Sequence, residues 1–255
     1  MPFTPAHVAA VLPLVSSPTI RRWLDPWALA LGAMVPDLPI FLPFLPERTD
    51  WHSLQGVLTL DLLSVLVLLG LFHGVFREPL IALLPPSLGG RAAVLKPSFR
   101  VLPIVAGAVV GSATHVFWDS FTHSTASMYW GWSGFDHRVL DVIPLFRALQ
   151  YGSSVVGLAI VVWWVWRGLA RMPAAAVPDR LVISRGVRAG VLAACAVGIL
   201  VGAVVWPMVD EPEYPGIASM LTKVGAGTVV GLSLVLLCYA LVWQVRRVVA
   251  VFEGA

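Results

Sequence analysis

Charged residues are scarce in this sequence. Only 12% of its 255 residues are charged and 58% are hydrophobic, whereas soluble domains carry about a quarter charged residues. This balance argues against a soluble globular fold and is typical of an integral membrane protein. At roughly 20 residues per spanning helix, the length allows about five or six membrane-spanning helices with short loops.

Cysteine is also scarce. The chain has two cysteines, Cys195 and Cys238, which lie in long apolar runs and form no CxxC pair. A disulfide framework is therefore not expected, and the absence of cysteine near the other polar groups argues against a structural thiolate zinc site. The start of the chain lacks a basic region, and Pro13 interrupts its first apolar run. We therefore expect the first spanning helix, rather than a signal peptide, to direct membrane insertion.

The basic residues do not form a nucleic-acid-binding surface. The sequence pI is about 9.2, but lysine and arginine are scattered over loops instead of being gathered on one face. A nucleic-acid partner is therefore not expected.

Long apolar segments define the predicted fold. They cover residues 56–76, 101–120, 153–166, 187–206 and 224–245, and each predicts a spanning helix. An earlier apolar stretch is broken by Pro36, Pro39 and Pro43, so it predicts a short helix that ends in an irregular turn. The expected fold is an all-α, polytopic integral membrane protein with about five spanning helices and short amino-terminal helices.

Lysine and arginine predict the orientation of the chain. If the chain crosses the membrane five times, the first, third and fifth spans end on the same side. Eleven of the 17 lysine and arginine residues lie on that side. That side should be cytoplasmic by the positive-inside rule. The amino terminus is then expected outside the cytoplasm of a bacterial cell.

The stretch THVFWDSFTH places three polar residues in otherwise apolar surroundings. His115, Asp119 and His123 are spaced by four, so on a helix they share one face. Imidazole and carboxylate groups at this spacing can hold a divalent cation or bond to each other. The same interval separates His137 from Asp141.

Other polar residues are predicted to lie on the same side of the membrane. Asp37 is in the proline-framed turn, His52 precedes the first span, and His7 is near the start. Five of the six histidines can therefore converge, as a polynuclear metal site requires. Such nitrogen and oxygen ligands suit zinc, with manganese as the alternative. Asp61, one turn into the first span, is costly there and is a further candidate for the polar centre.

Several motifs together resemble known families. MPFTPAH, GAMVPDLP, WHSLQGV, THVFWDSFTH and LFRALQYGSS resemble a bacterial family of membrane proteins of unknown function, over about residues 1–170. The order of the polar residues also resembles that of inner-membrane metal-dependent hydrolases. More distantly, it is similar to the zinc-dependent phospholipase C superfamily, whose members are all-helical and cleave phosphate esters at a trinuclear zinc site.

The resemblance implies a role for each residue. The implied metal ligands are His7, Asp37, His52, His115, Asp119, His123, His137 and Asp141, with Asp119 able to bridge two metals. Asp37 is also the implied catalytic base. Asp141 stands where the resembled pattern has glutamate, and its side chain is one methylene shorter.

The sequence thus predicts a membrane-bound, metal-dependent hydrolase of a phosphate ester. Residues 1–150 would carry the site, outside the cytoplasm, and residues 151–255 would add three anchoring spans. A site at the membrane surface favours a lipid-linked or headgroup substrate, with membrane lipid as the partner. The alternative is a non-enzymatic membrane protein with a structural metal site or a buried polar staple. An ion pathway is less favoured, because the last three spans offer almost no polar residues.

Overall fold

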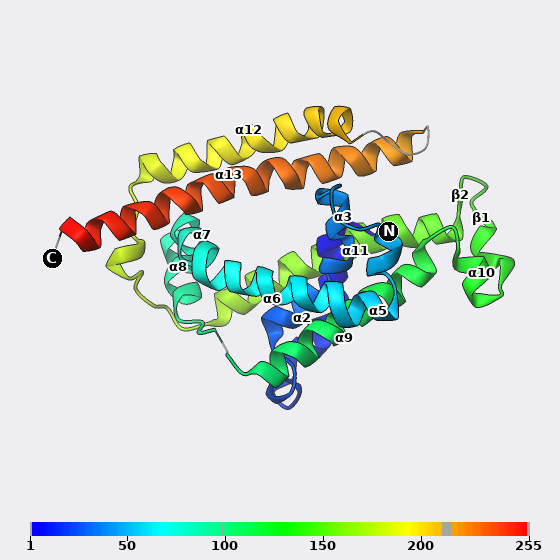
Figure 1. Ribbon diagram of the computed structural model, residues 1–255, viewed down its shortest axis with the longest axis horizontal. Coiled ribbons are helices and arrows are strands. Elements are labelled where there is room, and N and C mark those ends of the chain that lie inside the picture. The colour runs from blue at the N-terminus through cyan, green and yellow to red at the C-terminus, as the bar shows by residue number, and fades with distance from the viewer. Residues whose placement is uncertain (1, 98, 211–215, 254–255) are drawn as a thin grey trace. The chain divides into compact units, whose positions relative to one another are not determined.

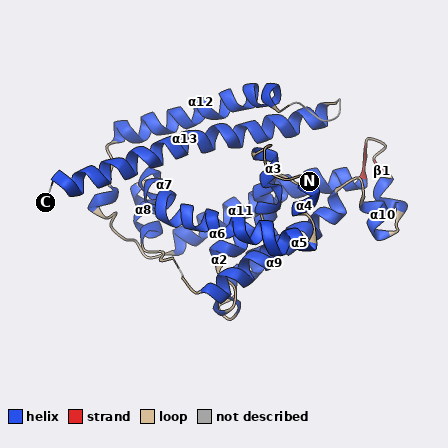
Figure 2. Ribbon diagram, viewed as in Figure 1, coloured by secondary structure: helices blue, strands red, loops and turns tan. Residues whose placement is uncertain are grey.

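The computed structural model describes residues 2–97, 99–210 and 216–253. Nearly all of its regular structure is helical (Figure 2). In the described residues, five helices are long and apolar enough to cross a membrane: Leu54–Leu83, Val101–Thr122, Leu145–Arg171, Arg185–Val209 and Ser219–Val249. The predicted all-α fold with five candidate spans is therefore confirmed.

The spans are longer than the apolar segments that predicted them. The first continues to Leu83, and the third begins at Leu145, before its apolar run. Helices extend past their apolar centre because long side chains such as Arg167 and Arg171 can reach the membrane interface from the last turns. The apolar run therefore marks the middle of each span and not its ends.

Two compact units make up the chain. The first contains the described residues of Met1–Pro39, Phe44–Leu69 and Ser98–Ala170, and the second those of Ile40–Pro43, Gly70–Pro97 and Arg171–Ala255. The division at residue 150 into a site region and a membrane anchor stays a prediction.

The first unit is built from short amino-terminal helices and three long ones (Figure 1). Its elements are η1 (Thr4–His7), α1 (Val8–Ser16), η2 (Ile20–Arg22), α2 (Pro26–Gly32), η3 (Val35–Asp37), α4 (Arg48–Trp51), α5 (Leu54–Gly56), η4 (Val57–Asp61), α6 (Leu62–Leu71), α9 (Val101–Thr122), α10 (Ala126–Trp130), η6 (Ser133–Asp136), β1 (Arg138–Val139), β2 (Ile143–Pro144) and α11 (Leu145–Arg171). The two strands pair in antiparallel fashion as a hairpin before α11. The short helix α3 (Leu38–Phe41) leads out of this unit.

Glycine lets α2 and α9 pack backbone against backbone. A Cβ atom on Gly32 would collide with the carbonyl oxygen of Ala108, and one on Gly111 with that of Leu29. Only a residue without a side chain allows this approach. The close packing brings the end of α2 directly beside the middle of α9.

The beginning of α2 is also attached to α9. Asp25 caps α2, because its carboxylate accepts hydrogen bonds from the backbone N–H groups of Trp27 and Ala28, both at 3.0 Å. Its own N–H donates to the carbonyl of Pro103 at 2.8 Å. A cap of this kind contributes about 1 kcal/mol, and here it also sets the register between the two helices.

The first candidate span contains two π-helical segments. The chain runs without a break through α5, η4, α6, η5 (Phe72–Phe76) and α7 (Arg77–Leu83), and the π segments are η4 and η5. Such segments are rare and occur often at functional sites. The first of them ends at Asp61, which is completely buried.

The second unit is dominated by α12 (Arg185–Val209) and α13 (Ile217–Glu253), which lie side by side (Figure 1). Gly198 and Gly202 on α12 face Gly231 and Gly227 on α13, and a Cβ atom at any of the four would collide with the opposite backbone. Small residues four apart are a common means of close helix packing in membranes. The unit also contains η5, α7, α8 (Pro86–Ala93) and η7 (Asp179–Leu181).

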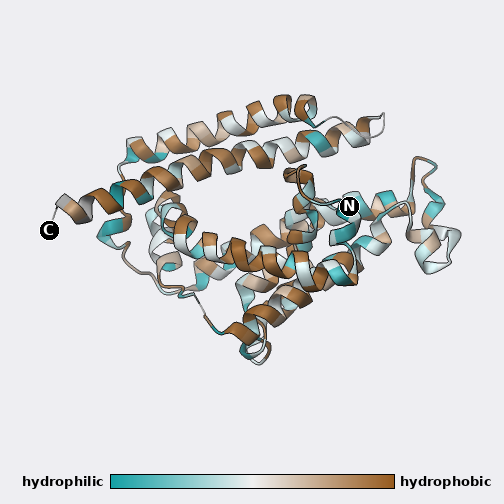
Figure 3. Cartoon of the chain, in the orientation of Figure 1, coloured by the Kyte–Doolittle hydropathy of each residue, from teal (hydrophilic) through white to brown (hydrophobic). Residues whose placement is uncertain are grey.

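The outer faces of α12 and α13 are apolar (Figure 3). Large hydrophobic side chains such as Leu200, Val204 and Leu241 are more than half exposed. Extended exposed apolar surfaces mark contact with a partner or a membrane, and the length of both helices favours a membrane.

Candidate metal centre

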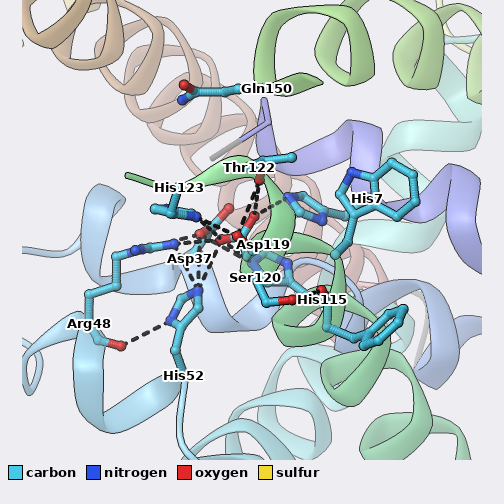
Figure 4. Close-up of polar contacts among 12 residues, drawn as sticks. His7, Asp37, Arg48, His52, His115, Asp119, Ser120, Thr122, His123 and Gln150 are labelled. Carbon is cyan, nitrogen blue, oxygen red and sulfur yellow. Dashed lines mark hydrogen bonds and ion pairs between the residues drawn. The ribbon is translucent and has the colours of Figure 1, made fainter. Parts of the chain in front are cut away.

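Six of the eight predicted ligands lie together in the first unit (Figure 4). They are His7 at the end of η1, Asp37 at the end of η3, His52 after α4, His115 and Asp119 on α9, and His123 directly after α9. These segments are far apart in the sequence, so tertiary packing and not local spacing assembles the group.

Four of these residues surround one point. The candidate ligand atoms of Asp37, His52, His115 and Asp119 all lie within 4.8 Å of one another. The Nε2 atom of His115 is 3.4 Å from Asp37 Oδ1 and 3.5 Å from Asp119 Oδ2. The Nε2 atom of His52 is 3.4 Å from the same Asp119 oxygen. Two ligands of a tetrahedral zinc ion, each about 2.1 Å from it, are about 3.4 Å apart, so the group could hold one ion.

The backbone orients both central histidines toward this point. The Nδ1 atom of His115 lies 2.8 Å from the carbonyl oxygen of Ala33, and that of His52 lies 2.9 Å from the carbonyl of Arg48. A carbonyl only accepts hydrogen bonds, so Nδ1 carries the proton in each ring. The Nε2 atom of each ring then faces the carboxylates, where it can hold either a proton or a metal ion.

Several buried atoms of the group have unused bonding capacity. Among the described residues, Asp37 Oδ1, His115 Nε2 and both ring nitrogens of His7 have no hydrogen-bond partner. Leaving a buried polar group unsatisfied costs about 1–3 kcal/mol, and native proteins rarely leave several together. A bound cation would satisfy the carboxylate oxygen and the imidazole nitrogens at the same time, so the residues fit a metal.

Asp119 faces two sides of the group. Its Oδ2 atom faces His52 and His115, whereas its Oδ1 atom lies 3.5 Å from Nε2 of His7. The His7 ring stacks on the His115 ring with centroids 3.8 Å apart. Burial, together with the neighbouring charge of His115, lowers the pKa of His7 to about 4. His7 is therefore neutral at pH 7, which is the form that binds metals.

Asp37 is completely buried and ionised. Its Oδ2 atom accepts a 2.8 Å hydrogen bond from the hydroxyl of Thr4. Burial alone would raise the pKa of Asp37, but the positive charges of protonated His115 and of Arg48 hold it well below its usual range. A proton and a metal ion therefore compete for the Nε2 atom of His115.

Arg48, which was not among the predicted ligands, is also part of the group. Its Nη2 atom lies 2.6 Å from Asp119 Oδ2 and 2.9 Å from His52 Nε2, and its Nε atom lies 3.7 Å from Asp37 Oδ1. The guanidinium thus uses the same atoms that a metal would use. Its position four residues before His52 is the interval that separates His115 from Asp119, and this was the signal that could have identified it.

His123 lies at the edge of the group, and its ring turns toward the backbone. Its Nδ1 atom donates to the carbonyl of Asp119 at 2.8 Å and is 3.8 Å from Oδ2 of the same residue. Burial lowers the pKa of His123 to about 4, so the ring is neutral. This contact ties the residue that follows α9 to the last turn of the helix.

The structure does not bring His137 and Asp141 to the group. Both are exposed in the β1–β2 hairpin, and among the described residues neither has a side-chain bond to the other six. The spacing of four would align them only on a helix. Here Leu140 and Asp141 have φ angles of 53° and 58°, which is a turn conformation that separates the two side chains.

Asp61 is a further buried acid near the group. Neither of its carboxylate oxygens has a hydrogen bond among the described residues. It interacts electrostatically with His115 and Asp37. Its place in a π-helical segment could not be read from the sequence, although its cost within an apolar span marked it as a candidate.

Comparison with known proteins identifies the family but no relative of known activity. A model of the family described as Domain of unknown function (DUF4184) matches residues 1–245, beyond the 1–170 over which the sequence showed a resemblance. No curated protein and no solved structure matches the chain significantly. The resemblance to hydrolases stays a prediction. The chain belongs to the DUF4184 family.

Proposed function

We propose that this protein is a membrane-bound, metal-dependent hydrolase of phosphate esters. The observation that carries the proposal is the buried group of Asp37, His52, His115 and Asp119, whose facing atoms fit a divalent cation. Two imidazoles and two carboxylates suit zinc, with manganese as the alternative. Both cysteines lie on other helices, α12 and α13.

A bound divalent cation would supply Lewis-acid activation of the phosphoryl group and lower the pKa of water toward about 7. The chain's own residues would hold the reactants around it. Asp37 is the candidate base by the resemblance, and its Oδ1 atom is buried and has no hydrogen-bond partner among the described residues. Thr4 fixes the other oxygen of the same carboxylate and so aims Oδ1 at the centre.

Arg48 is suited to bind the phosphate of the substrate. Its guanidinium is about one-third exposed, whereas the carboxylates beneath it are buried. A cation that occupied the group would compete with Arg48 for Asp119, and the released guanidinium could then bind phosphate oxygens in bidentate fashion. Arg48 would thus compensate the charge of Asp119 in the absence of substrate and bind the phosphate of the substrate when it is present.

An apolar pocket beside His7 supports a lipid-linked substrate. The pocket has a volume of about 420 Å³ and is lined by His7, Ala10, Trp118, Gly152 and Val156, among others. Its size is within the range of about 300–1,000 Å³ usual for ligand sites. His7 belongs both to the polar group and to the pocket lining, and residues of α11, a candidate span, form most of the remaining wall. A hydrocarbon chain could therefore lie along α11 while the ester reaches the metal. Membrane lipid is the proposed partner.

The proposed location is the bacterial cell membrane, with the site outside the cytoplasm. This orientation rests on the distribution of lysine and arginine and not on the geometry of the site. Labelling single introduced cysteines from outside intact cells, at Asp136 and at Ala174, tests it. The first should react and the second should not.

The rival is a non-enzymatic role as a structural metal site or polar staple. One observation favours it: the guanidinium of Arg48 is itself a counter-charge for Asp119. A hydrolysis assay separates the enzymatic role from the structural one. Zinc or manganese is restored to the detergent-purified protein, which is then offered an aryl phosphodiester and a short-chain phospholipid. Activity that is lost in Asp37→Asn but kept in the hairpin variant Asp141→Asn supports the enzyme. Metal binding with no hydrolysis of either probe supports the structural role.

A further inference from the structure

A second pocket lies wholly within the unit that contains α12 and α13. Its volume is about 610 Å³. Its charged and aromatic lining consists of Glu78 on α7, Arg180 on η7, and Tyr239, Trp243, Arg246 and Arg247 on α13. No residue of the candidate metal centre contributes to it.

The pocket carries excess positive charge at fixed positions. Glu78 holds two guanidiniums together, because its Oε1 atom is 3.2 Å from Nε of Arg180 and its Oε2 atom is 3.1 Å from Nη1 of Arg247. The pocket lining thus contains one carboxylate and three arginines, of which two pair with that carboxylate. Arg246 makes no ion pair or side-chain hydrogen bond with any described residue, and the two paired guanidiniums keep most of their five donors unused.

The inner part of the pocket offers one more donor. The hydroxyl of Tyr239 is buried and has no hydrogen-bond partner among the described residues. Its ring packs at right angles to Trp243, with centroids 6.1 Å apart. Tyr239 is seven residues before Arg246, about two helical turns, so the donors extend from the basic end of the pocket into the span.

The remaining walls are apolar. Val182, Val187 and Val242 line the pocket and are themselves exposed on its open side. A basic end with an adjacent apolar wall fits an amphiphile better than a free anion. Basic pockets between spanning helices are known to take the headgroups of anionic lipids.

We propose that this pocket binds the phosphate of an anionic membrane lipid, with the guanidiniums of Arg180, Arg246 and Arg247 around the phosphate and the acyl chains along the apolar wall. The site does not depend on the proposed hydrolase activity. A bound lipid would stabilise the α12–α13 hairpin, because its phosphate would link Arg180, which precedes α12, to the arginines near the end of α13.

The full chain in a neutral mild detergent provides the test. Native mass spectrometry and thermal unfolding would be measured with added phosphatidylglycerol, with phosphatidylcholine of the same acyl chains, and with inorganic phosphate. We expect retained lipid adducts and a raised melting temperature with phosphatidylglycerol alone. Equal responses to both lipids, or an equal response to inorganic phosphate, would overturn the proposal.

Variants locate the site. Arg246→Gln should weaken phosphatidylglycerol binding about tenfold, as expected for a lost charge-assisted hydrogen bond, and Tyr239→Phe should weaken it less. Neither should alter bound metal. Arg246 has no bond in the described protein, so its replacement should not affect folding, and Arg246→Lys should restore part of the binding. The matched control is Arg171→Gln, an exposed arginine outside the pocket. Equal weakening by the control, or undiminished binding in Arg246→Gln, would refute the assignment.

Discussion

Replacement of Arg48 by glutamine should change the metal-free and metal-bound protein in opposite directions. Without metal, Arg48 is the cation closest to Asp119, at 2.6 Å, and it also bonds His52 at 2.9 Å. Its removal leaves two buried carboxylates with less compensation. Loss of one partner of a fully buried pair costs about 3–5 kcal/mol. Since the Arg48 side chain is 32% exposed, we reduce this to about 1–3 kcal/mol.

With metal, the same change should be favourable. A cation no longer has to displace the guanidinium from Asp119 and His52, so zinc affinity should rise about tenfold, equivalent to about 1.4 kcal/mol. Because a ligand stabilises the folded state according to its concentration relative to Kd, zinc should raise the melting temperature of Arg48→Gln more than that of the wild type.

The assay is thermal unfolding in detergent, after chelation and again with a zinc titration. At about 2–4 °C per kcal/mol for a chain of this size, the metal-free variant should melt about 2–12 °C below the wild type. Arg22→Gln, an exposed arginine near the start of the chain, is the control and should change neither value. An unchanged melting temperature without metal, or an equal zinc effect in both proteins, would refute the competition between Arg48 and a cation.

Three further changes test other parts of the account. Gly202→Val should separate α12 from α13 and lower the melting temperature by several degrees, whereas Gly225→Ala, where a Cβ meets no atom within 4 Å, should not. Gly152→Leu should fill the pocket beside His7 and slow hydrolysis of a long-chain lipid ester, with cleavage of a soluble phosphodiester unchanged as the control. Thr4→Val removes the hydrogen bond to Asp37 and should cost about 1 kcal/mol; no change in unfolding would show that this bond does not orient the carboxylate.

The helical fold was predictable because membrane solvation imposes long apolar helices. Hydropathy found the middle of every span. It did not find the ends, because interfacial residues such as Arg167 continue a helix without an apolar signal. The π segment before Asp61 and the backbone contact at Gly32 also left no trace in hydropathy, since both depend on what packs against them.

The candidate site was predictable where its residues share a helix. His115 and Asp119 lie on one face of α9, as their spacing required. Topology placed His7, Asp37 and His52 on the same side of the membrane, and the resemblance implied their roles as ligands. In the structure Asp37 and His52 share one point with His115 and Asp119, and His7 lies beside the other oxygen of Asp119. His137 and Asp141 have the same interval of four, but they lie in a hairpin. An interval of four places two side chains on one face only where the residues form a helix.

Metal content of the purified protein tests the central claim most directly. Mass spectrometry of wild type in mild detergent should find zinc or manganese at one equivalent or more per chain. His115→Ala and Asp119→Ala should lose it while remaining folded, and His137→Ala should retain it. The account would be contradicted if the wild type held no metal even after attempted reconstitution and the His115 and Asp119 variants were only less stable. The group would then be a buried polar staple without a metal.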